Sequence, residues 1–370
     1  MNKNLEILNK PIFNLPVKRE KGDFIKYLEN KFNEFHSTLS EFDGELGDYI
    51  KENSEIISSQ LNCIFSALHS YYEGKTATAY NQLVNCLENV CCHLWIQTEQ
   101  VTEGRDKLYR VRTGDSTELE RKDLFHIPFE LRNLVRRQRF SLSGVPCLYL
   151  GTSIYTCWEE LNRPDINKIH ISRFDLNESD FNFLFLDQRS DIIRKWAEKP
   201  FEECEDGVKR HIKNFIVSFP LLLASSIKVE NYESDFVPEY IIPQLLLQWV
   251  TNSEHIDGIQ YISNKTKYSI KPVTFESETN IVIPIKEFKD KGYCPVLSSK
   301  IKLTQPISYN LLDLTNSEIK SKQKKSIWNS KKDKKTIELI KGNRTDYSET
   351  KFGILESKLQ EMETKYVIEK

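Results

Sequence analysis

Residues 139–151 read RFSLSGVPCLYLG, and the carboxylate of Glu160 follows shortly after them. An arginine and a turn of small residues lead into the short apolar run 147–150, which has the character of a buried strand. Residues 153–161 then have the apolar spacing of a helix, with Ser153 as a suitable N-cap. This order is typical of sites for phosphorylated, cationic ligands, because arginine binds phosphate and a carboxylate attracts positive charge.

The predicted helix that carries Glu160 places two apolar residues on the same face as this carboxylate. Cys157, Glu160 and Leu161 fall within one turn of each other and share one side of a helix. We therefore expect Glu160 to point toward protein, and Glu159, about 100° away around the helix, to be solvated. A half-buried carboxylate needs a positive partner, which is either a cationic ligand or an arginine in a salt bridge.

The composition indicates an ordinary soluble protein. Of 370 residues, 39% are hydrophobic and 29% are charged, and the formal net charge of -2 argues against nucleic acid as a partner. The best apolar candidate, 215–227, contains Ser218 and Pro220 and is too short to span a bilayer. Residues 1–4 lead into no hydrophobic segment typical of a secretion signal. We therefore expect a cytoplasmic protein without a membrane partner.

The eight cysteines and seven histidines have no spacing that suits a metal, and no C-x-x-C occurs. Cys91 and Cys92 fall in an apolar helical pattern, so we expect them to be small core residues in a reducing compartment. His36, His69 and His93 lie in helical patterns without acidic or cysteine partners. No metal site is therefore expected.

Apolar periodicity divides the chain into three regions. Region 1–104 is predicted to be all helical, with a hairpin that turns at Gly74. Region 105–314 alternates short strands with helices and is predicted to be an α+β domain. Region 315–370 is predicted to be a Lys-rich linker, followed by a short amphipathic helix over 352–362. The strands expected in the middle region are 108–111, 147–150, 168–174, 183–186, 258–262 and 280–285, and its expected helices are 153–161, 207–227 and 237–250.

Three further pieces of the middle region carry polar residues in unusual places. Arg110 lies inside the first strand, where it needs an anion or a sheet edge that faces water. Arg139 precedes Ser141 and a glycine, whose exposed backbone N–H groups could help to hold phosphate; the alternative is an ordinary surface arginine. Ser263 ends a strand, where serine commonly forms a turn. His126 is expected to be a structural hydrogen-bonding residue and not a base.

Taken in order, these pieces resemble the RES-domain family, which is named for an arginine, a glutamate and a serine. The resemblance covers residues 108–285, and the order and spacing of its short pieces make it fairly specific. The matching pieces are Tyr109-Arg110-Val111, Arg139-Phe140-Ser141-x-x-Gly144, Leu148-Tyr149-Leu150, Thr156-x-x-x-Glu160, Gly258-Ile259-x-Tyr261-x-Ser263 and Asn280-Ile281-Val282-Ile283.

The resemblance implies a fold and a set of site residues. The fold would be ADP-ribosyltransferase-like, with mixed or antiparallel sheets, preceded here by the all-helical region. By the resemblance, the catalytic residues are Arg110, Glu160 and Ser263, and the residues that bind NAD+ are Arg139, Tyr149 and Ser141.

The resemblance also implies an activity. Members of the family degrade NAD+, and many are toxins neutralised by a small antitoxin. The expected enzyme is an NAD+ glycohydrolase or phosphorylase, with water or inorganic phosphate as acceptor, that acts as a growth-arresting toxin or defence effector. NAD+ is then a substrate, and no cofactor is expected. The alternatives are a protein ADP-ribosyltransferase and a catalytically silent assembly module. Expected partners are an antitoxin or regulatory protein and a second copy of the chain.

The chain departs from the compact members of that family in two ways. It carries the N-terminal helical region, and a long segment, 186–240, separates Glu160 from Ser263. These additions could cover the site, bind a partner or gate activity. Arg112 competes with Arg110 for the role of the family arginine, because residues two apart on a strand face the same side.

Overall fold

The computed structural model describes residues 3–96, 107–114, 119–176, 181–190, 193, 199–267, 270–271, 278–315 and 335–368. The chain forms two compact units. The first comprises Met1–Gln97, Arg136–Ser143 and Asn182–Asn264, and the second comprises Thr98–Val135, Gly144–Phe181 and Lys265–Lys370. Each unit is therefore assembled from segments that are far apart in the sequence.

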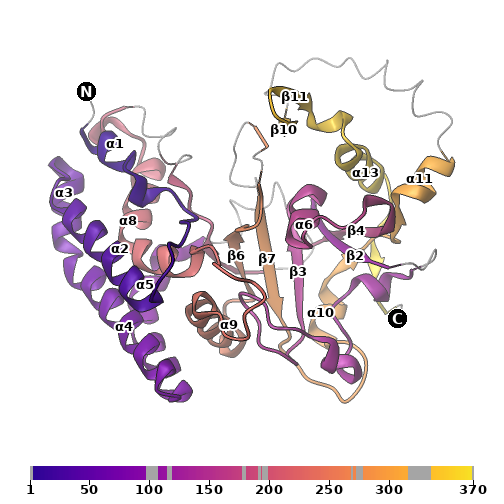
Figure 1. The fold of residues 1–370 in the computed structure, drawn as a ribbon, viewed down its shortest axis with the longest axis horizontal. Coiled ribbons are helices and arrows are strands. Elements are labelled where there is room, and N and C mark those ends of the chain that lie inside the picture. Colours follow the sequence, from indigo (N-terminus) through magenta and orange to yellow (C-terminus); the bar gives the residue numbers. More distant parts are fainter. Residues whose placement is uncertain are drawn as a thin grey trace. The chain divides into compact units, whose positions relative to one another are not determined.

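Helices dominate the first unit (Figure 1). The predicted hairpin is confirmed, because α4 and α5 pack together and are joined through Gly74, whose φ of +79° favours glycine. Asp23 accepts a hydrogen bond from the Lys26 N–H and so caps α2. The α-helices of this unit are α1 (Lys3–Leu8), α2 (Phe24–Leu39), α3 (Gly44–Glu52), α4 (Ser54–Tyr72), α5 (Thr76–Leu94), α8 (Asp206–Ser226) and α9 (Ile241–Asn252), with short 3-10 turns at Pro11–Phe13, Phe201–Glu203 and Pro238–Tyr240.

Helix α8 belongs to the core of this helical unit, although it lies far along the chain. Phe215 and Phe219 of α8 contact the ring of Phe13, with centroids 5.9 and 5.0 Å apart. Phe219 also lies 4.7 Å from Phe35 of α2. Aromatic pairs at these separations stabilise beyond the area they bury. The long segment 186–240 therefore supplies a core helix to the N-terminal helices.

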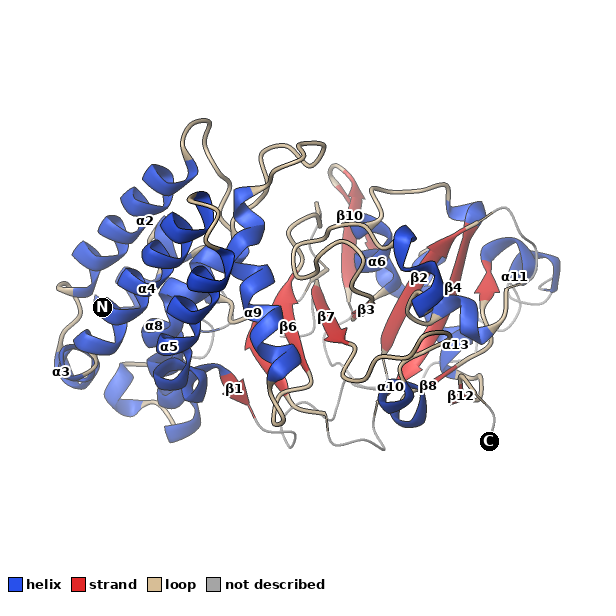
Figure 2. Cartoon of the chain, turned by 90° about the horizontal axis from the view of Figure 1, so that it is seen from below, coloured by secondary structure: helices blue, strands red, loops and turns tan. Residues whose placement is uncertain are grey.

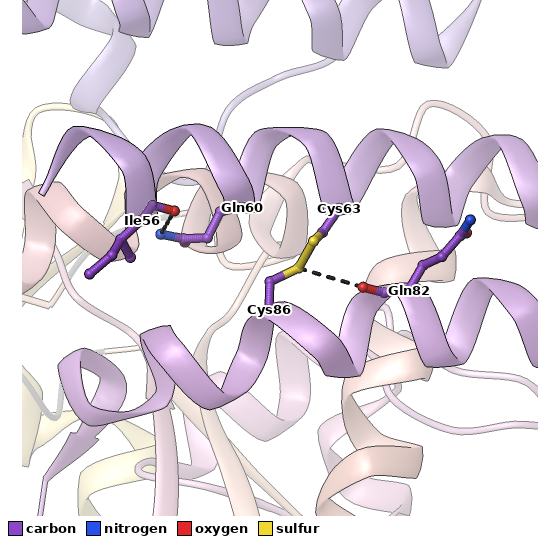
Figure 3. Close-up of a disulfide and its surroundings, with 5 residues drawn as sticks. All are labelled: Ile56, Gln60, Cys63, Gln82 and Cys86. Atoms are coloured by element: carbon purple, nitrogen blue, oxygen red, sulfur yellow. Dashed lines mark hydrogen bonds between the residues drawn. A yellow bond between two sulfur atoms is a disulfide. The ribbon is translucent and has the colours of Figure 1, made fainter.

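A disulfide joins the two helices of the hairpin. Figure 3 shows the bond between Cys63 of α4 and Cys86 of α5, whose Cα atoms are 6.5 Å apart. Cys91 and Cys92 follow on α5, but Cys91 is partly exposed and Cys92 is exposed. The expectation that these two are core residues is therefore wrong, because the apolar stripe of α5 that faces its neighbours runs through Leu83, Leu87, Val90 and Leu94.

The first unit also contains a small group of strands: β1 (Trp95–Ile96), β5 (Phe183–Leu186) and β6 (Gly258–Ile262). The prediction that region 1–104 is all helical is therefore wrong at its end, because β1 pairs with β5. β5 pairs with β6 in parallel, with Leu184 opposite Ile259. Every residue of β5 is buried, which explains its uninterrupted apolar sequence FLFL. Asp187, directly after β5, accepts a hydrogen bond from Gln260 Nε2 at 2.6 Å.

The second unit is built on an antiparallel sheet in the order β7–β3–β2–β4–β8–β12, and β9 also pairs with β4. Figure 2 shows β3, β2 and β4 as neighbouring red arrows. The strands are β2 (Leu108–Thr113), β3 (Cys147–Gly151), β4 (Ile169–Asp175), β7 (Thr279–Pro284), β8 (Lys302–Leu303), β9 (Ile307–Ser308) and β12 (Lys365–Tyr366). The helices are α6 (Ile154–Glu160), α10 (Pro295–Lys300), α11 (Tyr309–Thr315) and α13 (Lys351–Gln360), with 3-10 turns at Arg121–Leu124, Phe129–Leu134, Ile166–Lys168 and Tyr347–Glu349.

The C-terminal segment is an integral part of the second unit. Tyr155 of α6 and Phe352 of α13 belong to one core and contact each other at 5.6 Å. Arg173 of β4 donates to the backbone oxygens of Leu359 at 3.0 Å and Met362 at 2.9 Å. The predicted amphipathic helix is confirmed, and its apolar face packs against α6 and the sheet.

The mixed helix and sheet architecture agrees with the predicted α+β class. All six strands expected in the middle region are present, as are its three helices. The region 315–342 differs from the prediction: residues Thr336–Ile340 and Asn343–Asp346 form the hairpin β10–β11. The other part of the predicted Lys-rich linker, 316–334, lies outside the described residues. Within the part of the chain that the structure describes, no helix is both long enough and apolar enough to cross a membrane.

Candidate active site

The end of β3 is the point where three strands of the second unit meet. Gly151 pairs with Tyr109 of β2 on one side and with Asn280 of β7 on the other. A Cβ atom at Gly151 would lie 2.7 Å from Cys157 Sγ and 3.3 Å from Asn280 Oδ1. Such distances are too short for ordinary packing, so glycine leaves the room that both side chains occupy.

Glu160 ends α6 and lies half-buried beside this point. The buried Asn280 donates from Nδ2 to Glu160 Oε1 at 2.8 Å. Lys265 Nζ donates to the backbone oxygen of Glu160 at 2.8 Å, where the C-terminal end of a helix favours a cation. The carboxylate therefore points toward protein, as the helix pattern predicts.

Arg110 lies on β2, directly after the residue that pairs with Gly151. Its Nη1 atom is buried and has no hydrogen-bond acceptor among the described residues. Desolvation, together with the charge of Arg112, lowers the pKa of Arg110 to about 10. The nearby groups that oppose this shift are thiols and the phenol of Tyr149, not carboxylates. A guanidinium with a buried nitrogen in these surroundings is suited to an anionic ligand.

Cys157 lies near both Arg110 and Glu160. It is buried, and its Sγ donates to the backbone oxygen of Tyr109 at 3.2 Å. Burial raises the pKa of Cys157 to about 12, with Glu160 adding to the rise and Arg110 opposing it. The thiol is thus within electrostatic range of both the carboxylate and the guanidinium, so the second unit brings Arg110 and Glu160 to the same region.

The choice between Arg110 and Arg112 is clearer in the structure than in the sequence. Arg112 is exposed, and its Nη1 donates to the backbone oxygen of Asp123 at 2.8 Å. Arg110 alone of the two has a buried nitrogen without an acceptor among the described residues. Tyr149 is half-buried on β3, close enough to Arg110 to influence its pKa. Of the two arginines, Arg110 is therefore the one better suited to an anionic ligand.

Arg139 lies in the first unit and makes internal hydrogen bonds. It is buried, and it donates from Nη1 to the backbone oxygen of Ser225 at 3.0 Å and from Nη2 to that of Ile227 at 2.8 Å. With the Asn264 amide oriented so that its oxygen faces the guanidinium, that oxygen accepts from Nη2 at 2.6 Å and from Nε at 3.0 Å. Arg139 also lies over the ring of Tyr240, 5.3 Å from its centroid. An ordinary surface arginine is therefore excluded, and its contact with phosphate stays a prediction.

Ser263 and Ser141 are also buried in the first unit. Ser263 directly follows β6, as predicted, and its neighbour Asn264 contacts Arg139. The backbone N–H of Ser141 donates to the backbone oxygen of Gln138 at 3.3 Å. The backbone N–H of Gly144 donates to the backbone oxygen of Val135 at 3.0 Å. The expectation that these N–H groups are exposed for phosphate is wrong, because tight turns use them internally.

Two other expectations have opposite outcomes. Glu159 is buried, not solvated: it accepts from Tyr155 Oη at 2.6 Å and from Arg163 Nη2 at 2.7 Å. His126 is structural, as expected. Its Nε2 accepts from the Cys294 N–H at 2.9 Å, and burial lowers the pKa of His126 to about 4.

No cluster of three or more His, Cys, Asp or Glu side chains within the described ranges could hold a metal ion.

Comparison with known proteins gives one informative relative. The chain is 31% identical over 314 residues to "Putative toxin YopC" of Bacillus subtilis (strain 168), and the match covers 80% of this chain and 68% of that protein. The chain belongs to the family of YopC. No family model and no solved structure matches the chain itself.

The similarity within the YopC family extends beyond the predicted catalytic region. The match extends over 314 residues, which is longer than the whole predicted catalytic region, residues 105 to 314 of this chain. The helical region or the C-terminal segment, or both, therefore belongs to what the two proteins share. This agrees with the two compact units, each of which is assembled from several parts of the chain.

Sequence reasoning did not identify Asn280 and Gly151 as site residues in this YopC-family chain. Asn280 entered the resemblance only as the start of a strand, and Gly151 as the end of another. A glycine at the junction of a strand and a helix, in Leu150-Gly151-Thr152-Ser153, is a signal for close approach of another group. Nothing in the local sequence indicates that Asn280 reaches Glu160, because the two residues are 120 positions apart in the chain. The segment between them includes Asn182–Asn264 of the first unit.

Proposed function

We propose that the protein cleaves the nicotinamide–ribose bond of NAD+ and acts as a toxin. The observation that carries this proposal is that the second unit contains, near Cys157, both Arg110, which has a buried nitrogen without an acceptor in the described chain, and Glu160, whose carboxylate accepts from Asn280. A ligand that contacts both groups would carry both a negative and a positive charge. NAD+ has both, in its pyrophosphate and its nicotinamide ring.

Each residue has a role that follows from its chemistry. The pyrophosphate would supply oxygen acceptors for the Arg110 guanidinium. As the bond between ribose and nicotinamide breaks, its electron pair passes to the ring nitrogen and positive charge develops on the ribose. The Glu160 carboxylate would stabilise that charge and bind the ribose hydroxyls. Tyr149 would lie against a ring of the ligand.

The ribose carbon then takes an acceptor. Water gives ADP-ribose after loss of one proton, and inorganic phosphate gives the phosphorylated sugar. By the resemblance to the RES-domain family, Ser263 would be catalytic, and Arg139 and Ser141 would bind NAD+. An antitoxin and self-association are proposed on the same ground.

The toxin role is supported by membership of the family of YopC, whose name describes it as a putative toxin. Loss of NAD+ arrests growth by removing a central redox carrier, so the proposed reaction would account for toxicity. The two parts of the proposal are separable, because toxicity can be measured in cells and NAD+ consumption with purified protein.

The decisive experiment incubates purified protein with NAD+, with and without inorganic phosphate, and identifies the products by mass spectrometry. Free ADP-ribose indicates water as acceptor, its phosphate indicates phosphorolysis, and label on protein indicates ADP-ribosyl transfer. Intact NAD+ with wild-type protein would refute the proposal.

Three variants assign the roles. Glu160→Gln keeps the size of the side chain and should lower turnover by about 100- to 1000-fold, because it removes charge stabilisation that acts in the transition state. Arg110→Lys should weaken NAD+ binding, because lysine lacks the planar fork. Arg112→Lys is the matched control, since Arg112 shares the strand but is exposed. This variant should leave both the turnover and the affinity for NAD+ near those of wild type.

A further inference from the structure

Asn280 is hydrogen-bonded to the Glu160 carboxylate. Its Nδ2 donates to Glu160 Oε1 at 2.8 Å, the length of a charge-assisted bond. Asn280 is itself buried and lies within β7, whose neighbours in register are fixed along β3. The donor is therefore attached to a rigid strand, while the acceptor ends a short helix.

The position of the amide is defined on its other side as well. Asn280 is paired in register with Gly151, and its Oδ1 lies where a Cβ of any larger residue would crowd it, at 3.3 Å. A buried asparagine held in this way has little freedom to rotate away from its partner. The absence of a side chain at Gly151 thus leaves room for the Asn280 amide, which in turn donates to the carboxylate oxygen of Glu160.

We infer that Asn280 is a positioning residue that holds the Glu160 carboxylate in its reactive orientation. This inference rests on the proposed function for its effect on turnover, but the contact itself can be tested without it. A neutral amide that donates to a carboxylate favours the charged form and restricts its rotamer. An enzyme gains from such support because the carboxylate must be placed accurately before charge develops on the substrate.

The test compares Asn280→Ala and Asn280→Asp with a matched control, Asn310→Asp. Asn310 is an exposed asparagine of the same unit whose Nδ2 donates only to the backbone oxygen of Asn167 among the bonds described, so it receives the same change of charge away from Glu160. For NAD+ consumption we expect Asn280→Ala to lower kcat by about 10- to 100-fold with KM little changed, from the loss of one hydrogen bond to a charged group.

Asn280→Asp places a second carboxylate beside Glu160. Two carboxylates at this distance share a proton more readily than either does alone, so the acidic limb of the pH–rate profile should move to higher pH. Asn310→Asp should not move it. In the Glu160→Gln background, Asn280→Ala should cause little further loss of kcat, because a residue that acts through Glu160 has nothing left to position.

Thermal unfolding provides the readout that does not need activity. Asn280→Asp should unfold at a lower temperature than wild type at pH 8, and this difference should shrink at pH 5 and on adding Glu160→Gln. Such relief by Glu160→Gln supports the contact even if wild-type protein leaves NAD+ intact, in which case the proposed function fails alone. Equal destabilisation with or without Glu160→Gln, or losses of kcat that multiply, would overturn the inference.

Discussion

Replacing Glu356 with glutamine should make the stability of the protein less dependent on pH between pH 5 and pH 8. Glu356 lies on α13, and its Oε1 accepts from the Ile154 N–H at 2.8 Å and from Tyr347 Oη at 2.6 Å. It thereby joins the C-terminal helix to the first residue of α6, the helix that ends at Glu160. Desolvation raises the pKa of Glu356 from 4.5 to about 7, although both hydrogen bonds oppose the rise.

The sign and size of the effect follow from this shift. The folded protein holds the proton of Glu356 more tightly than the unfolded chain does, so the stabilisation is present at low pH and is lost as the pH rises toward 7. The difference between 4.5 and about 7 corresponds to about 3 kcal/mol of unfolding free energy. Because the residue is partly exposed, solvent screens part of this energy, and we expect a loss of about 1–3 kcal/mol.

Urea unfolding at pH 5 and pH 8 measures this difference. Wild-type protein should lose more unfolding free energy between the two pH values than Glu356→Gln, whose amide oxygen can still accept both hydrogen bonds. The control Glu361→Gln changes an exposed glutamate at the end of the same helix and should follow wild type. Parallel pH dependence of wild type and Glu356→Gln would refute the assignment of a desolvated carboxyl at this position.

Three further outcomes are expected. Gly151→Ala should lower the unfolding free energy by about 1–3 kcal/mol, because its methyl group would lie 2.7 Å from Cys157 Sγ. Adding Cys157→Ala should restore part of this loss. If the double variant shows no restoration, the strain does not come from the contact with Cys157. Arg139→Lys should cost about 2–4 kcal/mol in urea unfolding, because lysine cannot satisfy the carbonyl oxygens that the guanidinium binds, and a stability equal to wild type would contradict these hydrogen bonds. Without reductant, Cys63 and Cys86 should resist alkylation in unfolded protein while the other cysteines react, as counted by mass spectrometry; eight alkylated cysteines would show that the bond is absent.

Local patterns in the sequence account for most helices and strands. The apolar stripes of α4 and α5, the Ser153 cap of α6 and the alternation around β2 and β3 act over a few residues, so they can be recognised without knowledge of neighbours. These patterns do not predict the hairpin β10–β11, because its sequence is mainly polar and charged and so lacks the apolar alternation of a half-buried strand.

Glu159 shows why a helical wheel can assign exposure wrongly. The wheel places Glu159 away from the apolar face, but the chain reverses directly after α6 at Asn162 and Arg163, which both have φ of +59°. This turn brings the Arg163 guanidinium back onto the carboxylate, with bonds of 2.9 and 2.7 Å. The exposure of a side chain near a helix end depends on the path of the following loop, which the periodicity of the helix does not contain.

The sequence by itself determined the class of secondary structure, the strands that carry Arg110 and Tyr149, and the short helix that carries Glu160, because these follow from apolar spacing and capping within a few residues. Only the tertiary structure decided that α8 packs with the N-terminal helices, that the C-terminal helix supports α6, and that Asn280 holds Glu160. Those contacts join residues separated by long stretches of chain, and their free energy depends on burial and geometry that no local pattern records.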